Sequence, residues 1–207
     1  MVAASLRSQR GFTLTELVIS MAVIAFILGG MLTLQLTGQQ TYLTGSNQVE
    51  SQESGRIALQ RMTTEIRGAG NDPTGASPAV WTKITNASAT AFTIQNDWSG
   101  DGFINNAITV NVNGTLRGEQ VTYSLNGSTL QRQESAIDAT PQTVIDGVDA
   151  LTFTYYDKTN LPIANPGANA SSILTIAISL RTRPTDQPAA TQGRTWVTMD
   201  DRVRIRN

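Results

Sequence analysis

Oxygen-bearing groups recur at every second position in residues 97–106, which read DWSGDGFINN. Side chains and one main-chain carbonyl share this spacing: Asp97, Ser99, Asp101, the carbonyl of Phe103, and Asn105. Calcium binds oxygen ligands in loops of this kind, and a glycine such as Gly102 permits the sharp turn between them. The spacing therefore predicts a calcium-binding loop.

The calcium pattern is incomplete where a bidentate acid should close the loop, because that position is Ile108. Calcium takes about 6–8 oxygen ligands, so Glu119 on the next predicted strand, Asn106 or solvent would have to complete the site. Apart from this position, the loop resembles the EF-hand and dockerin calcium loops. The alternative is a plain turn between two strands, since Ser-Gly-Asp-Gly favours a turn without any ion. Both interpretations stay open, and calcium is the one cofactor considered.

Catalytic chemistry has few candidate residues in this chain. The sequence contains no histidine and no cysteine, which removes the commonest general base and all thiolate chemistry. Acids such as Asp138 and the pair Asp200-Asp201 have no nucleophile motif beside them. We therefore predict that the protein is not an enzyme. Its net charge of −1 gives no reason to expect nucleic acid as a partner.

A single acid, Glu16, lies at the start of a long apolar segment. No charged residue occurs from Leu17 to Val49, and Leu17–Leu36 is strongly apolar. About 20 such residues span a bilayer as a helix, whereas a buried helix of a small soluble protein rarely has apolar residues on every side. Arg7 and Arg10 precede the segment, so the positive charges predict a cytoplasmic N-terminus and an exported remainder.

The residues in front of the apolar segment carry a more specific pattern. Gly11-Phe12-Thr13-Leu14-Thr15-Glu16, with the short basic leader before it, resembles the type IV prepilin signal. The resemblance implies that a prepilin peptidase cuts after Gly11 and methylates the new amine of Phe12. It also implies that Glu16 meets the N-terminal amine of a neighbouring subunit in a filament. An ordinary secretory signal would have a shorter apolar stretch followed by its cleavage site. Thr13 and Glu16 also fit a capping box, which would need no further function.

The helix should continue beyond the membrane. One face of the following segment is apolar at spacings of four, three and four residues: Gly55, Leu59, Met62 and Ile66. Residues 68–73, rich in glycine and ending in proline, then stop the helix near Arg67. The sequence therefore predicts a leader at residues 1–11, a helix at 12–70 with its membrane part at about 14–36, and a β-rich head at 71–207.

Strand patterns fill the predicted head and give an α+β fold, in which a long N-terminal helix precedes an antiparallel β-sheet domain. The predicted strands are Val80–Ile84, Ala91–Gln95, Ala107–Val112, Glu119–Leu125, Thr129–Gln133, Ala150–Tyr156, Ile173–Arg183 and Trp196–Arg206. Asn126-Gly127 predicts a type I′ hairpin turn within Glu119–Gln133. The last two strands could pair across a loop at 184–193.

Three further stretches sharpen the resemblance. Arg56–Gly70 resembles the helix that follows the membrane in PilW-type minor pilins, and Arg202–Asn207 resembles their C-terminal end. Gln142–Phe153 resembles a segment that PilW-type pilins share with the J-type pseudopilins of type II secretion. This resemblance implies a structural subunit of an inner-membrane-assembled filament. Its expected partners are other pilins or pseudopilins, the prepilin peptidase and the inner membrane, with the head periplasmic before assembly.

Three alternatives remain beside a PilW-like minor pilin. The prepilin signal is shared, so a minor pseudopilin of a type II secretion system fits equally well. A calcium-dependent adhesin carried on a pilus would differ only in having a ligand site. A membrane-anchored enzyme is disfavoured by the absence of histidine and cysteine.

Overall fold

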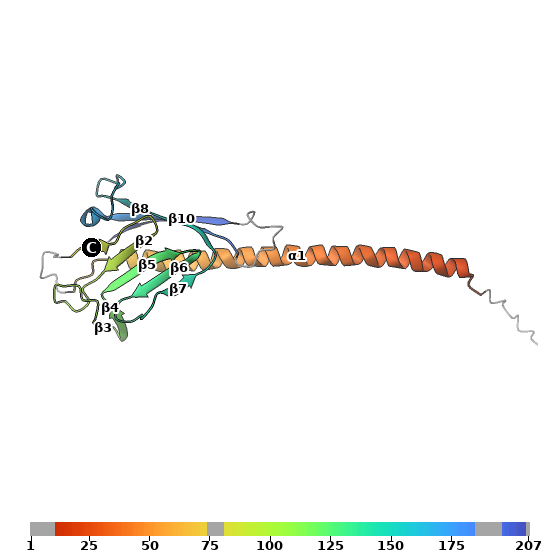
Figure 1. Ribbon diagram of the computed structural model, residues 1–207, viewed down its shortest axis with the longest axis horizontal. Coiled ribbons are helices and arrows are strands. Elements are labelled where there is room, and N and C mark those ends of the chain that lie inside the picture. Colours follow the sequence, from red (N-terminus) through yellow and green to blue (C-terminus); the bar gives the residue numbers. More distant parts are fainter. Residues whose placement is uncertain (1–10, 74–80, 185–195, 206–207) are drawn as a thin grey trace, which may run out of the picture. The chain divides into compact units, whose positions relative to one another are not determined.

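The computed structural model describes residues 11–73, 81–184 and 196–205 (Figure 1). The chain forms two compact units, Met1–Gly45 and Ser46–Asn207. In the first unit the described residues are almost entirely helical, and the second contains the rest of the same helix and all of the described strands. The fold is therefore α+β, with one long N-terminal helix followed by antiparallel sheets, as the sequence predicts.

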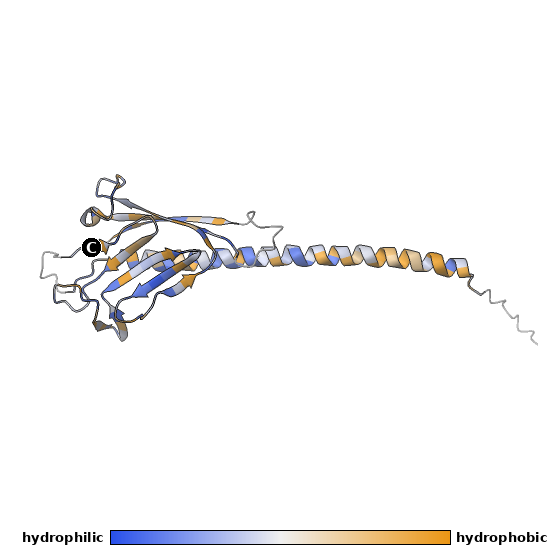
Figure 2. Cartoon of the chain, in the orientation of Figure 1, coloured by the Kyte–Doolittle hydropathy of each residue, from blue (hydrophilic) through white to orange (hydrophobic). Residues whose placement is uncertain are grey.

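Helix α1 runs from Leu14 to Arg67 and has 54 residues. Every large apolar side chain between Phe12 and Leu43 is 52% to 86% exposed. Figure 2 shows how apolar residues predominate along the N-terminal part of this helix. Within the described part of the chain, α1 is the one helix that is long and apolar enough to cross a membrane. Apolar surface on this scale is unfavourable in water, so it calls for lipid or protein around it.

From Ser51 onward, α1 buries one face in the second unit. The buried residues are Ser51, Gly55, Ala58, Leu59, Met62, Thr63 and Ile66, which include the four residues of the predicted apolar face. The helix comes close to the last strand at Gly55, where a Cβ atom would lie only 2.1 Å from Cε of Met199. About two turns further on, the Thr63 hydroxyl donates to Oδ2 of Asp201 at 2.9 Å.

Three antiparallel sheets make up the rest of the second unit. The largest has the order β1-β2-β5-β6-β7, and its strands are β1 (Ile84–Thr85), β2 (Ala91–Gln95), β5 (Gln120–Asn126), β6 (Thr129–Glu134) and β7 (Gln142–Ile145). The second has the order β10-β9-β8, with β8 (Val148–Tyr156), β9 (Thr175–Thr182) and β10 (Val197–Arg204). A small hairpin joins β3 (Thr109–Val112) to β4 (Thr115–Gly118), and a short 3-10 helix, η1, spans Ala170–Ser172.

Phe92 on β2 connects the two larger sheets inside the core. Its ring stacks on Tyr123 of β5 with centroids 5.5 Å apart, and it meets Phe153 of β8 edge-on at 4.7 Å. Such aromatic pairs contribute about 0.5–1.5 kcal/mol each beyond the burial of their surface. Met62 and Ile66 of α1 belong to the same hydrophobic cluster. The helix and both sheets therefore share one interior.

Most of the strands lie close to their predicted ranges. Ala91–Gln95 coincides with β2, and the two last predicted strands pair antiparallel as β9 and β10. The sequence pattern does not predict β4 and β7, which have only four residues each. The predicted loop at 184–193 and parts of the predicted strands Val80–Ile84 and Trp196–Arg206 lie outside the described residues.

The hairpin between β5 and β6 differs by one residue from the expectation. Asn126 pairs with Thr129, so the two turn residues are Gly127 and Ser128 rather than Asn126 and Gly127. Of the two, Gly127 alone has a positive φ, of 60°. Glycine at the first turn position suits a type II′ turn rather than the predicted type I′ turn. The reason is that the strand pairing extends one residue beyond the apolar run.

Candidate functional site

The N-terminal candidate site consists of Gly11, Phe12 and Thr13, which precede α1, and of the first turn of the helix. Gly11 and Phe12 lie outside the helix, Phe12 is 85% exposed, and a Cβ atom built on Gly11 would meet nothing within 4 Å. The Gly11-Phe12 peptide bond, at which cleavage is predicted, is therefore accessible and outside regular structure. Arg7 and Arg10 of the predicted leader lie outside the described residues.

Glu16 and Thr13 form a reciprocal pair at the start of α1. The main-chain N–H and the hydroxyl of Thr13 donate to Oε2 of Glu16, at 3.0 and 2.8 Å. In return, the main-chain N–H of Glu16 lies 3.3 Å from Oγ1 of Thr13 and donates to it. These contacts form the capping box that the sequence offers as the alternative interpretation. In this single chain, Glu16 therefore has a local structural role.

The capping box satisfies hydrogen bonds at Glu16, but among the residues that the structure describes no cation pairs with its negative charge. Glu16 is the only charged residue from Gly11 to Val49, and the nearest described acid or base of α1 lies beyond that range. An ionised carboxylate in an apolar membrane segment is costly unless a cation accompanies it. The capping box therefore does not explain why an acid occupies this position. Pairing with a cation from another molecule would explain it.

The Asp97 loop is a second candidate site, in the second unit. Asp97 is completely buried. Its Oδ1 accepts from the Ser99 hydroxyl at 3.1 Å and from the Gly100 N–H at 2.6 Å, and its Oδ2 accepts from the Gly102 N–H at 2.7 Å. The positive φ values of Gly100 and Gly102, 73° and 83°, let the chain wrap around this carboxylate.

Glu119 joins the loop from the residue just before β5. It is also completely buried, and its two oxygens accept from the N–H groups of Ser99 at 3.1 Å and Asn105 at 2.6 Å. The structure thus brings Glu119 to the loop. The calcium hypothesis requires an acid at this place, because the position that should close the loop is Ile108. Together, Asp97 and Glu119 hold the loop from both sides.

The other predicted calcium ligands are arranged differently. Asp101 is exposed and accepts from the Phe103 N–H at 2.9 Å, while Oδ1 of Asn105 accepts from the Ala107 N–H at 3.0 Å. In the described ranges, no three histidine, cysteine, aspartate or glutamate residues gather as they would around a metal ion. The N–H donors are those that a turn without an ion needs, and the calcium site stays a prediction.

A buried ionic cluster within the second unit has no counterpart in the sequence analysis. Nε of Arg132 on β6 donates to both oxygens of Glu65 on α1, at 3.1 and 3.2 Å. Its NH2 group donates to Glu134 at 2.6 Å, and NH1 lies 3.7 Å from Oδ2 of Asp138. Glu65 also accepts from the Tyr123 hydroxyl at 2.7 Å. No local motif signals this cluster, because its members come from α1, β5, β6 and the following turn.

The ionic cluster changes the proton affinity of two of its members. Burial alone would lower the pKa of Arg132, but its bonds to Glu134 and Glu65 raise the pKa well above its ordinary value. Burial, followed by the negative charge of Glu65, raises the pKa of the Tyr123 hydroxyl. Both groups therefore keep their protons under ordinary conditions, and the cluster serves structure rather than proton transfer.

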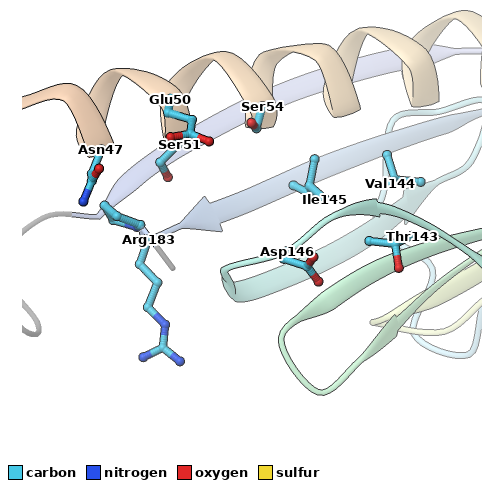
Figure 3. Close-up of a pocket in the computed structure, with 10 residues that line it drawn as sticks. Asn47, Glu50, Ser51, Ser54, Thr143, Val144, Ile145, Asp146 and Arg183 are labelled. Carbon is cyan, nitrogen blue, oxygen red and sulfur yellow. The ribbon is translucent and has the colours of Figure 1, made fainter. Parts of the chain in front are cut away.

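A cavity of about 340 Å³ lies between α1 and β7 (Figure 3). Its walls include Glu50 and Ser51 of α1, and Asp146 and Arg183 beyond the ends of β7 and β9. The buried Ser51 hydroxyl has no hydrogen-bond partner, while Oδ1 of Asp146 accepts from the Thr129 hydroxyl at 2.7 Å. The lining is polar and of mixed charge, and it contains no arrangement suited to catalysis.

Comparison with known proteins concerns mainly the first site. Residues 6–32 match the family model described as the prokaryotic N-terminal methylation motif. Among solved structures, a type IV-like pilin from Thermus thermophilus matches with 13% sequence identity and a TM-score of 0.43, over 74% of this chain and 95% of that chain.

The family match shows that this chain carries a prokaryotic N-terminal methylation motif at residues 6–32, at the start of the long apolar helix. The motif predicted from Gly11, Phe12 and Glu16 lies within these matched residues. Membrane anchoring fits the motif and the apolar helix.

Proposed function

We propose that the protein is a structural minor pilin of a type IV pilus, similar to PilW-type minor pilins. The observation that carries the proposal is the position of Gly11, Phe12 and Glu16 within the methylation motif, directly before an exposed apolar helix. Prepilin peptidase would remove the leader and methylate Phe12. The mature subunit would then enter a filament, or prime its assembly, through its apolar helix.

The orientation in the inner membrane follows from charge. Arg7 and Arg10 precede the apolar segment, and the next basic residue is Arg56. Basic residues stay on the cytoplasmic side of single-pass helices. The N-terminus would therefore be cytoplasmic and the β-rich second unit periplasmic until the subunit joins a pilus.

A minor pseudopilin of a type II secretion system is the second candidate. Gln142–Phe153, the stretch with J-type resemblance, forms β7, a turn at Gly147 with a φ of 73°, and most of β8. This segment fits both candidates equally. A calcium-dependent adhesin would need a ligand site as well as the Asp97 loop, and it ranks third.

Deletion of the gene in its native host tests the proposal. Electron microscopy should show loss of surface pili, and the wild-type gene should restore them. Secreted proteins are measured in the same strains. Loss of secretion with intact pili would favour the pseudopilin, and loss of neither would contradict both assignments.

A further inference from the structure

A second, larger cavity lies within the second unit, where three connecting segments converge. Its volume is about 620 Å³, within the usual range of about 300–1,000 Å³ for small-molecule sites. The segments are residues 81–83 before β1, the turn that begins at Asp157 after β8, and the region of η1. Loops held by a rigid scaffold are the usual places for binding.

Both lysines of the protein line this cavity. Lys83 and Lys158 are the only lysines in the sequence, and they are 75 positions apart. Both line this one cavity. Within the described residues, neither ammonium group forms an ion pair with an acid at salt-bridge distance. Asp157 also lines the cavity, and Lys158 is one of the groups that lower its pKa, so the two cations exceed the acids of the lining by one. This excess of positive charge favours a ligand that carries negative charge.

The position of Lys83 is fixed by its contact with Gly70. A Cβ atom at Gly70 would lie 2.6 Å from Cγ and 2.7 Å from Cδ of Lys83, so the lysine stem passes directly over the glycine. Gly70 also has a φ of 81°, a conformation that favours glycine. The stem of this lysine is therefore held by packing.

Lys158 is presented by a tight turn. Oδ1 of Asp157 accepts from the N–H groups of Thr159 at 2.8 Å and Leu161 at 3.0 Å. Asn160 in the same turn has a φ of 66°. The Leu161 N–H and the Thr159 hydroxyl lower the pKa of Asp157, so this acid stays ionised, with Oδ1 engaged in its own turn.

The remaining walls supply an aromatic ring and hydroxyl groups. Trp81 lines the cavity and is partly buried, and Ser171 and Ser172 of η1 line it as well. An indole ring offers a flat apolar face, on which the C–H face of a sugar ring can pack. Serine hydroxyls both donate and accept hydrogen bonds, as sugar hydroxyls require.

We propose that this cavity binds an acidic saccharide, a sugar ring that bears a carboxylate or a phosphate. Lys83 and Lys158 contact the anionic group, Trp81 packs against the ring, and the serine hydroxyls bond to its hydroxyls. This binding activity is separate from filament assembly, and it does not depend on the proposed pilus function.

Fluorescence titration of the full chain tests the proposal. The protein is kept in micelles of a detergent without a sugar headgroup, at one ionic strength, and tryptophan emission is followed. The probes are trigalacturonic acid and glucose 6-phosphate, which separate carboxylate from phosphate as the anionic group. We expect a saturable change with at least one of them, and loss of that change in Trp81→Phe.

Variants and control ligands decide the outcome. Lys83→Gln with Lys158→Gln should weaken binding about tenfold or more, whereas Arg117→Gln on β4 removes a charge elsewhere and should leave it unchanged. Thermal melting confirms that each variant is folded. Equal binding of maltotriose, acetate or inorganic phosphate would overturn the proposal. So would full affinity in the double lysine variant, or no response to either acidic sugar.

Discussion

Glu65 on α1 and Arg132 on β6 form a two-point contact inside the second unit, with Nε of the arginine 3.1 and 3.2 Å from the two carboxylate oxygens. The side chains are only 17% and 6% exposed. The pair joins the helix to the middle of the five-stranded sheet. Because Tyr123 donates to the same carboxylate, Glu65 holds two strands at once.

Loss of Glu65 should be far more harmful than loss of its exposed neighbour. Glu65→Ala leaves the buried Arg132 with one strong partner fewer, and we expect it to lower the free energy of unfolding by about 3 kcal/mol. Arg61 lies 3.6 Å from Glu65, and its side chain is 51% exposed. Arg61→Ala should therefore lower the free energy of unfolding by less than about 1 kcal/mol. Denaturant unfolding followed by circular dichroism compares the two. Equal losses would contradict a special role for the buried pair.

High pH should destabilise the second unit through Tyr123. Burial and Glu65 raise the pKa of its hydroxyl above the ordinary value near 10. Below about pH 10 both states are protonated and the contribution is complete. Above it the unfolded chain ionises first, so stability falls by up to about 1.4 kcal/mol per pH unit for this tyrosine. Unfolding measured from pH 9 to 12 should show a shallower decline in Tyr123→Phe. An unchanged slope would assign the effect to other groups, Tyr155 among them.

Processing should occur between Gly11 and Phe12. Intact mass and N-terminal sequencing of protein from its native membranes should give a chain that begins with N-methylated Phe12. Gly11→Val should retain the leader, because the prepilin signal that this stretch resembles is cut after glycine. The substitution itself should not disturb the fold, since a Cβ at Gly11 would meet nothing within 4 Å. A mature protein that begins at Met1, or after Thr37, would exclude prepilin processing.

Glu16 should matter for assembly through its charge rather than through its capping contacts. Glu16→Ala should still insert, since the segment becomes more apolar, but it should enter filaments poorly because the amine of a neighbouring Phe12 loses its partner. Thr13→Ala is the matched control, because it removes the Thr13 side chain from the capping box and keeps the carboxylate. Quantitative immunoblots of sheared filaments measure incorporation. Equal losses in the two variants would favour the capping interpretation.

Calcium should stabilise the protein through the Asp97 loop. Ligand that binds only the folded state raises the melting temperature, and we expect an increase at millimolar calcium relative to chelator. Asp101→Ala should lose this increase, whereas Asp157→Ala, in an unrelated turn, should keep it. If calcium leaves the melting temperature of the parent protein unchanged, the hydrogen bonds that main-chain N–H groups donate to Asp97 and Glu119 are sufficient to explain the conformation of the loop.

Periodicity alone was sufficient for the main elements. The apolar run after Glu16 and the face from Gly55 to Ile66 depend on local spacing, which a helix turns directly into a surface. The strand at Ala91–Gln95 was equally clear. In contrast, β7 has only four residues, and it forms because β6 offers an open edge beside it. A local sequence pattern does not show that a partner strand such as β6 is available.

The candidate sites divide in the same way. Gly11, Phe12 and Glu16 are contiguous, so their motif is visible in the sequence and matches a family model. The contact between Glu65 and Arg132 spans 67 positions, and the meeting of the two lysines spans 75. Such pairs are set by strand order and by the path of the loops, and neither follows from local composition.

Asp201 affects whether the sheets of neighbouring copies of this protein can join edge to edge. It lies on β10, the edge strand of its sheet, and it accepts a hydrogen bond from Thr63 of α1. A one-residue slip of β10 would break this bond and exchange the inward and outward residues of the whole strand. An inward-facing acid on an edge strand also discourages another chain from extending the sheet. If the chain acts as the proposed membrane-anchored subunit, these features would keep neighbouring copies from joining sheet to sheet into aggregates.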